Sequence, residues 1–299
     1  MQPAPTAELL ARCTFPPAGT AVTCAVSGGP DSTALMALAV AAGLSVTAVH
    51  VDHCLRPGSA AEADVVAASA ALLGAAVVVR RATVDVDRGP NLEARARAAR
   101  YDALPVDVMT GHTADDQAET VLLNLLRGAA ASGLAAMRPG ARRPILALRR
   151  RETVALCAAM ELPTVDDPSN ADPRHLRNRV RHELVPLLCD LAQRDVVPIL
   201  TRQAGIAADE SDLLDELAAA LDPTDAKALA VAPPALARRA VRRWLTIDHP
   251  PDLATVERVL AVARGESSAT ETSDGRRVGR SNQRLSLSGP SRPAGERVT

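Results

Sequence analysis

Aromatic residues are almost absent from this chain. Among its 299 residues there is one Phe, one Tyr and one Trp: Phe15, Tyr101 and Trp244. Apolar residues still make up 47% of the chain and charged residues 23%, which is an ordinary globular composition. The core must therefore consist of Ala, Val and Leu, and few side chains remain on which nucleic-acid bases could stack. The length allows one large domain and a smaller one.

Lysine is equally scarce. Lys227 is the only lysine, so arginine carries nearly all of the positive charge, and arginine suits two-point contact with phosphate or carboxylate groups. The net charge of −1 gives no indication of nucleic-acid binding by the field of the whole protein. The arginines are instead concentrated in two clusters, at 138, 142, 143 and 149–151 and at 174, 177, 179 and 181.

Cysteine pairs with metal-site spacing are also missing. The five cysteines are odd in number and form no C-x-x-C pair, which argues against a disulfide framework, a zinc ribbon and an iron–sulfur site. After Met1 there is no basic and then apolar leader, and no apolar run approaches the length of about 18 residues that a membrane helix needs. These absences predict a soluble cytoplasmic protein.

A Walker phosphate loop, G-x-x-x-x-G-K-[ST], does not occur either. What is present at 27–33 is Ser-Gly-Gly-Pro-Asp-Ser-Thr, between an apolar run typical of a buried strand and a helical run at 34–42. Two glycines let the backbone approach a ligand closely, and free N–H groups at a helix start can bind an anion. The sequence therefore predicts a phosphate-binding loop, although a simple Ser/Gly turn that caps a helix is the alternative. The candidate residues are Ser27, Gly28, Gly29, Pro30, Asp31 and Ser32.

Strands and helices alternate through the first two thirds of the chain, which predicts right-handed crossovers and a parallel α/β sheet. Ligands then bind at the carboxyl ends of the strands. From about residue 195 the pattern is mainly helical, with a possible hairpin at 269–288. We therefore expect a catalytic domain over 1–192 and a smaller, mainly helical domain over 193–299. The predicted strands are 20–26, 44–51, 76–84 and 106–110, with short ones at 144–148 and 162–165; helices are expected at 59–73, 90–104, 111–127, 151–160, 196–221, 234–246 and 253–264.

The most specific pattern is Gly-His-Thr-Ala-Asp-Asp-Gln-Ala-Glu-Thr at 111–120. His112 and Asp116 are four residues apart and Asp116 and Glu119 three apart, so they share one helix face. Such a face can hold Mg²⁺ through carboxylate and phosphate oxygens, or it can receive an ammonium group. A capping box of Thr113 and Asp116 is the alternative, but it does not explain why His112 and Glu119 are aligned with Asp116.

Three further patterns each allow two interpretations. The arginine-dense helix at 91–101 is either a solvated helix with i,i+4 pairs or one that aims an arginine at phosphate charge. His50 and His53 resemble a metal pair, yet contacts to a loop or a nucleotide are favoured because no cysteine cluster joins them. The basic turn at 177–181 is either a solvated face or a contact for the nucleic-acid backbone.

Five segments, taken in order, resemble one family over roughly residues 20–190. That family is the tRNA(Ile)-lysidine synthetases, which belong to the PP-loop or N-type ATP pyrophosphatases. The resemblance implies a Rossmann-like fold of the adenine nucleotide alpha hydrolase type. The segments are SGGPDS, HVDHCLR, NLEARARAARY, GHTADDQAETVLLNLLRG and DDPSNAD followed by RNRVR.

The resemblance also implies a reaction and its participants. ATP activates the C2 carbonyl of the wobble cytidine in the CAU anticodon of tRNA(Ile), and free L-lysine then displaces AMP from that carbon, so that the tRNA reads AUA. The implied roles are phosphate binding by 27–32, Mg²⁺ binding by Asp31 and Asp116, transition-state stabilisation by Arg97, lysine binding by Asp116 and Glu119 beside His112, and tRNA binding by Arg174, Arg177, Arg179 and Arg181.

The sequence departs from the family at two places: Cys54 stands where the family's HxxHGLR has glycine, and the stretch at 101–106 is short. Two other functions compete. A different PP-loop tRNA-modifying enzyme, such as a thiolase, would need sulfur-carrying cysteines, and a nucleotide-binding regulator without catalysis would tolerate loss of Asp116 and Glu119. A homodimer is a further option, because dimers are the commonest oligomers.

Overall fold

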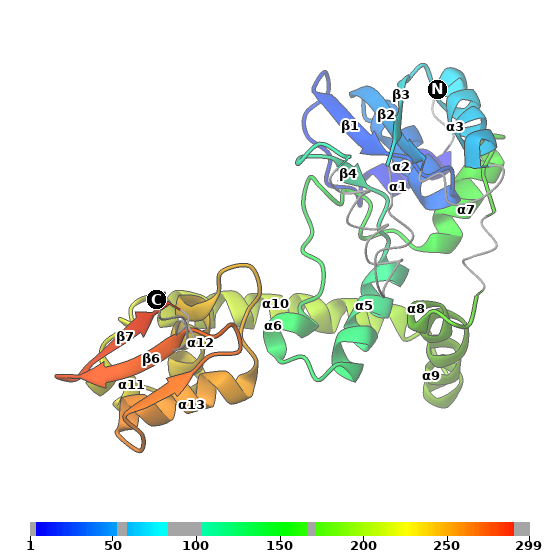
Figure 1. The fold of residues 1–299 in the computed structure, drawn as a ribbon. Helices are drawn as coiled ribbons and strands as arrows, with labels where there is room; N and C mark the ends of the chain where they lie inside the picture. Colours follow the sequence, from blue (N-terminus) through cyan, green and yellow to red (C-terminus); the bar gives the residue numbers. More distant parts are fainter. Residues whose placement is uncertain (1–3, 53–58, 83–102, 167–171, 290–299) are drawn as a thin grey trace. The chain divides into compact units, whose positions relative to one another are not determined.

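The computed structural model describes residues 4–52, 59–82, 103–166 and 172–289 (Figure 1). The chain divides into two compact units, Met1–Ala207 and Ala208–Thr299, and the division falls inside helix α10 (Val197–Ala219). The sequence places the boundary at 192/193, directly after helix α9 (Val185–Ala192) and before α10.

Four parallel strands form the sheet of the first unit, in the order β3–β2–β1–β4 (Figure 1). The chain runs from the central β1 outward to β3 and then returns to the other side of β1, so its direction of travel reverses between β1 and β4. In open α/β sheets, ligands bind beside such a reversal, at the carboxyl ends of the strands. The predicted parallel sheet is confirmed. Its strands are β1 (Ala21–Ala25), β2 (Ser45–Asp52), β3 (Ala76–Arg81) and β4 (Met109–Thr110).

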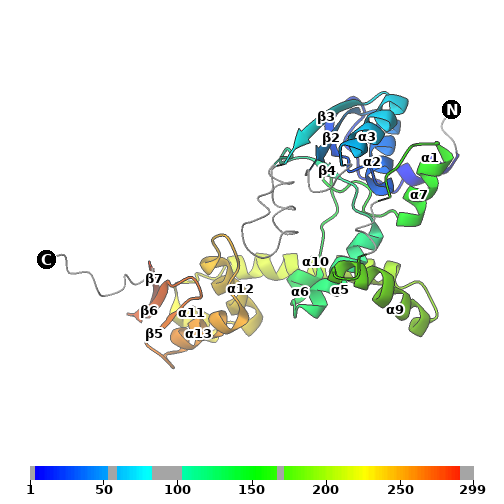
Figure 2. The same ribbon diagram turned by 45° about the vertical axis from the view of Figure 1, so that its right-hand side comes forward.

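Aliphatic side chains form the core around this sheet, as the lack of aromatic residues requires. Helix α2 (Pro30–Ala41) packs on β1 and β2, and α3 (Ser59–Leu73) packs on β2 and β3 (Figure 2). Helix α7 (Arg150–Ala159) lies along α2, and the short α1 (Ala4–Leu10) also contacts α2. Fully buried side chains of this core include Leu35, Met36, Leu38, Ile145 and Leu148, whereas Phe15 is only partly buried against it.

Two predicted strands are wrong. Residues 144–148 form turns, in which the Leu146 and Leu148 N–H groups donate to the carbonyls of Arg143 and Ile145. Residues 162–165 are not a strand either, although the Val165 N–H donates to the Gly28 carbonyl. The fourth strand is shorter than predicted because the chain turns just before it, with Val108 N–H donating to Pro105 O. Most of the predicted helix at 90–104 lies outside the described residues.

A helical group completes the first unit: α5 (Ala114–Leu126), α6 (Ala131–Leu134), α8 (Leu176–Arg179), the π-helical turn η2 (Val180–Leu184) and α9. In η2 the Val185 N–H donates to Val180 O, five residues back. Pro186 follows immediately, and because proline has no N–H and clashes with the carbonyl four residues before it, it favours such a widened turn. Val180 packs against Leu122 and Leu123 of α5.

The second unit has its own core, built by helices and a small antiparallel sheet in the order β5–β6–β7. Its helices are α11 (Ala226–Val231), α12 (Pro234–Leu245) and α13 (Leu253–Arg264), and its strands are β5 (Ala269–Glu271), β6 (Arg277–Ser281) and β7 (Arg284–Ser288). The predicted hairpin is present, and a second tight turn at Asn282 and Gln283, both with positive φ, adds β7. Over the described residues, no helix is both long and apolar enough to cross a membrane.

Candidate active site

The predicted phosphate loop has a backbone shape that only small residues permit. Gly28 has φ of +91°, and a Cβ on it would lie 2.9 Å from Cγ2 of Val165. Gly29 is extended and precedes Pro30, the first residue of α2. The Ser32 hydroxyl donates to Gly29 O at 2.9 Å and accepts from Ser27 N–H at 3.1 Å, which closes the loop on itself. The loop therefore lies at the N-terminus of α2, where free N–H groups favour an anion.

His50 anchors the start of this loop. Its ring is 2% exposed, and Nδ1 lies 2.9 Å from the carbonyl oxygen of Val26. This is the loop contact that the sequence favoured over a zinc site. His53 and Cys54 lie outside the described residues.

The loops after β1 and β4 touch at Gly111. A Cβ at this position would lie 2.7 Å from the carbonyl oxygen of Asp31, so only glycine allows this close approach. The contact brings the start of α5 beside the start of α2. The predicted phosphate loop and the predicted His112–Asp116–Glu119 face therefore meet at the carboxyl ends of neighbouring strands.

Asp116 takes part in both of the interactions weighed from the sequence. Its Oδ2 accepts from Thr113 N and Thr113 Oγ1, each at 2.9 Å, which is the capping interaction. Its Oδ1 accepts from Nη2 of Arg150 at 2.8 Å. Burial raises the pKa of Asp116, but the Arg150 charge and the Thr113 hydrogen bond outweigh burial, so the pKa lies below its usual value. His112 lies close by, with Nδ1 2.8 Å from Oγ1 of Thr110.

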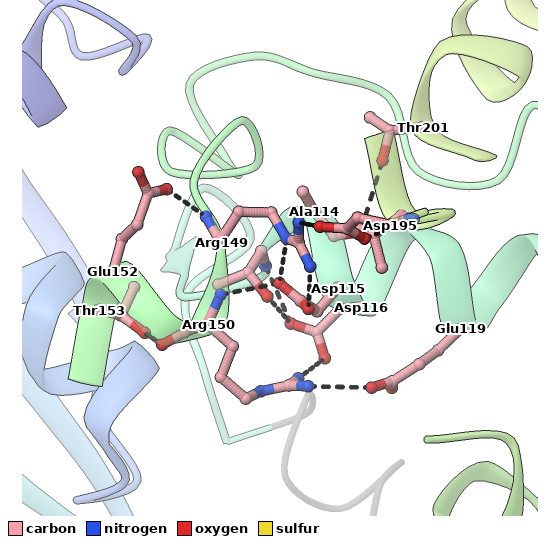
Figure 3. Close-up of polar contacts among 12 residues, drawn as sticks. Ala114, Asp115, Asp116, Glu119, Arg149, Arg150, Glu152, Thr153, Asp195 and Thr201 are labelled. Carbon is pink, nitrogen blue, oxygen red and sulfur yellow. Dashed lines mark hydrogen bonds and ion pairs between the residues drawn. The ribbon is translucent and has the colours of Figure 1, made fainter. Parts of the chain in front are cut away.

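Arg150 joins the two loops through three carboxylates, and Figure 3 shows two of them, Asp116 and Glu119. Its Nε donates to Oδ2 of Asp31 at 3.1 Å, Nη2 to Asp116, and Nη1 to Oε1 of Glu119 at 3.0 Å. The Thr153 hydroxyl donates to the other oxygen of Asp31. Burial nevertheless raises the pKa of Asp31 above its usual value, because Thr153 and Arg150 only partly offset the loss of solvent.

Glu119 is the most buried acid of the site, with a side chain 2% exposed. Besides Arg150, it accepts from Nε of Arg177 at 3.0 Å and from Nε of Arg181 at 2.7 Å. A buried carboxylate without partners is costly, and three guanidinium groups satisfy this one. Arg177 of α8 and Arg181 of η2 reach Glu119 because both elements pack against α5.

The four arginines of residues 174–181 thus divide into two pairs. Arg177 and Arg181 bind the carboxylates of α5, whereas Arg174 and Arg179 are exposed and pair with Asp172 and Glu183 on their own segment. Only the second pair matches the open basic face expected from the sequence.

A second ion-pair group lies beside the first and shares no side chain with it. Asp115 accepts from Nε and Nη2 of Arg149 at 3.0 and 3.1 Å and from the backbone N–H of Arg150 at 2.8 Å. Arg149 also pairs with Asp195 (Figure 3). Burial raises the pKa of Asp115, but these contacts outweigh burial and lower the pKa overall. This group fixes the start of α7 against the start of α5.

Sequence reasoning missed Arg150 and Thr153. Arg150 stood in an arginine cluster to which no role was given; the available signal was a run of three arginines at a predicted helix start, where the helix dipole disfavours cations. Arg97, predicted for transition-state stabilisation, lies outside the described residues.

The carboxylates of Asp31 and Asp116 have the chemistry that Mg²⁺ prefers, since this ion is usually held by one or two carboxylates together with phosphate oxygens. Arg150 bonds one oxygen of each in this structure. Where residues are described, no group of three or more His, Cys, Asp or Glu side chains is arranged as a metal site.

Comparison with known proteins gives the family of this chain. Residues 6–188 match the family model of the PP-loop domain. The tRNA(Ile)-lysidine synthase of Nocardia farcinica is 46% identical over 247 residues, covering 77% of each chain. That of Rhodococcus erythropolis is 44% identical over 242 residues, covering 75% of this chain and 73% of the relative.

Among solved structures, the U34-tRNA thiolase NcsA from Methanococcus maripaludis, with its [4Fe-4S] cluster, superimposes with a TM-score of 0.55 at 15% identity. It covers 67% of this chain and 77% of its own. At that identity the likeness concerns the fold alone. The sequence matches cover most of the chain at well over 30% identity, and the chain therefore belongs to the tRNA(Ile)-lysidine synthase family of PP-loop proteins.

Proposed function

We propose that this protein is a ligase that forms a carbon–nitrogen bond between free L-lysine and C2 of the wobble cytidine in the CAU anticodon of tRNA(Ile). ATP supplies the energy, and AMP and pyrophosphate leave. The observation that carries the proposal, beyond family membership, is that Asp31 of the phosphate loop and the Asp116–Glu119 face bind one guanidinium group. A nucleotide on the loop and an amine on the carboxylates would then be neighbours.

In this proposal the loop residues Ser27, Gly28, Gly29, Pro30, Asp31 and Ser32 bind the phosphates of ATP. Asp31 and Asp116 would hold Mg²⁺, which would supply charge neutralisation at the phosphates. Arg97, placed there by the family resemblance alone, would stabilise the charge that develops during adenylation.

Asp116 and Glu119 would receive the ammonium group of lysine. An amine attacks only after it loses a proton, and the carboxylates and His112 are the nearby groups that could accept one. Because Glu119 already binds three guanidinium groups, the ammonium would replace at least one of them. Arg174 and Arg179, which are exposed, would bind tRNA phosphates, and Arg177 and Arg181 would follow if they left Glu119.

The alternative, a PP-loop enzyme that transfers sulfur, is less well supported at three of the five cysteines. Burial raises the pKa of Cys13 and Cys157 to about 11 and that of Cys24 to about 12. Thiols with such pKa values are protonated at neutral pH and are poor nucleophiles. The homodimer and the cytoplasmic location stay predictions from the sequence.

Incubation with radiolabelled lysine, ATP and an unmodified tRNA(Ile) transcript that has a CAU anticodon tests the proposal. We expect label in the tRNA and one AMP for each lysine, with no label when ATP is omitted. A tRNA(Met) transcript, which shares the CAU anticodon, is the matched control and should remain unlabelled. Absence of label from tRNA(Ile) would refute the proposed function.

A further inference from the structure

Arg150 contacts both halves of the proposed site. Asp31 belongs to the phosphate loop at the start of α2, and Asp116 and Glu119 belong to α5, where the amine would bind. Each of the three guanidinium nitrogens donates to a different one of these carboxylates, at 3.1, 2.8 and 3.0 Å. One planar group thus sets the spacing of three side chains.

The position of Arg150 is costly for stability. It is the first residue of α7, where the helix dipole disfavours a positive charge, and its side chain is only 23% exposed. The carboxylates compensate: burial lowers the pKa of Arg150, but Asp116, Glu119 and Asp31 outweigh burial and raise the pKa above its usual value. A simple start of a surface helix would not require such an arrangement.

Arginine is suited to this position and lysine is not. A guanidinium group has five N–H donors in a fixed plane, so it can bind three acceptors at once with defined angles. An ammonium group has the same charge, but it is a compact point charge on a flexible stem and does not define such a plane.

We propose that Arg150 is a positioning residue that holds Asp31 of the phosphate loop in register with Asp116 and Glu119. This inference rests on the proposed function. Its consequence is that the lysine amine reaches the activated carbon before water does.

The chemistry makes this consequence measurable. In the proposed transfer step, the lysine nitrogen bonds to C2, the bond from C2 to the AMP oxygen breaks, and the nitrogen loses a proton to a neighbouring base. If water attacks C2 instead, the same bond breaks, cytidine is restored and AMP leaves without lysine. A misaligned site therefore consumes ATP without attaching lysine.

The experiment measures the ratio of lysine attached to AMP released for each variant. We expect a ratio of about one for the parent protein and below about 0.2 for Arg150→Gln, because misplacement by about 1 Å can slow a positioned reaction about 100-fold. Arg150→Lys, which keeps the charge but not the planar fork, should give an intermediate ratio.

Arg149→Gln is the matched control. Arg149 precedes Arg150 at the same helix start, is 15% exposed and pairs with Asp115 and Asp195 rather than with the site carboxylates. Its loss should lower stability and both products in proportion, because the backbone N–H of Arg150 still donates to Asp115 and keeps the start of α7 beside α5. The ratio should therefore stay near one.

A ratio near one in Arg150→Gln, or equal ratios in the Arg149 and Arg150 variants, would overturn the inference. If Arg150→Gln does not fold, Arg150→Lys decides by the same ratio. If the parent protein attaches no lysine, the proposed function itself is refuted. If the parent attaches lysine and the Arg150→Gln variant keeps a ratio near one, only the role of Arg150 is refuted.

Discussion

The two carboxylate oxygens of Asp116 have different roles, and the substitution Asp116→Asn separates these roles. Oδ2 caps α5 through Thr113, and Oδ1 faces Arg150. Asn keeps an oxygen for the cap but loses the charge. We therefore expect Asp116→Asn to lower the free energy of unfolding by about 1–3 kcal/mol. Lysine transfer should fall at least about 100-fold, because the amine loses its acceptor.

Asp115→Asn is the neighbouring control, since the Asp115 side chain binds the Arg149 guanidinium and the backbone N–H of Arg150 rather than the Arg150 guanidinium. Its lysine transfer should remain close to that of the parent protein. Thermal melting and the radiolabel assay measure the two effects for both variants. Unchanged transfer in Asp116→Asn would remove Asp116 from the mechanism.

The sequence could reveal the acids but not their partner. Asp116 and Glu119 are three residues apart on α5, so helical spacing alone places them on one face. His112 precedes the helix, so the predicted helix face does not include it. Arg150 is 119 residues from Asp31 and 34 from Asp116. A contact between residues so far apart in the sequence depends on the packing of α7 against α2, which no local sequence pattern encodes.

At the scale of elements, the segment α8–η2 divides its arginines between the site and the surface. Arg177 is 33% exposed and pairs with Glu119, whereas Arg179 is 56% exposed and pairs with Glu183. We expect each single Ala variant to weaken tRNA binding and reduce its salt dependence by about one charge. Only Arg177→Ala should also lower the KM for lysine, because the amine then has one competitor fewer at Glu119. We expect a decrease of about five-fold, which corresponds to about 1 kcal/mol.

Filter binding of tRNA across a salt series and steady-state lysine kinetics measure these effects. Arg179→Ala serves as the control for Arg177→Ala, since both remove one charge from the same turn. A KM for lysine that is equal in the two variants would contradict competition between Arg177 and the amine at Glu119. If both variants bind tRNA as tightly as the parent protein at every salt concentration, the turn does not bind tRNA phosphates.

Element type was predictable wherever the local pattern was strong. Helices α3 and α13 have the predicted bounds, because glycine at 74 and 265 and a cap at Asp252 define their ends. The failures are apolar stretches with no strand partner. Residues 144–148 are apolar because Ile145 and Leu148 fill the core from a turn, and hydrophobicity alone does not distinguish that from a strand.

At the scale of the whole molecule, the two compact units have separate cores, and the second unit has a fluorescent reporter of its own. Trp244 is the only tryptophan, and it packs against the core of the second unit. Its fluorescence therefore follows the second unit alone, whereas far-UV circular dichroism follows the helices of both. The ion pairs of Asp115, Asp116 and Glu119 all lie in the first unit.

Acid should affect the first unit through Asp115. Its pKa is lowered in the folded protein, so the stability it contributes is present above the usual aspartate value of about 4 and is lost as the pH falls through the lowered pKa.

Asp115→Asn lacks this contribution at every pH. The melting temperature of the first unit should thus be lower in the variant near neutral pH, and the difference should shrink as the pH falls below the usual aspartate value of about 4 and through the lowered pKa. Melting of the second unit, followed by Trp244, should be the same in both proteins. A difference in melting temperature between the two proteins that does not change with pH would contradict this role of the Asp115 ion pair. The same difference in Trp244 fluorescence would contradict its restriction to the first unit.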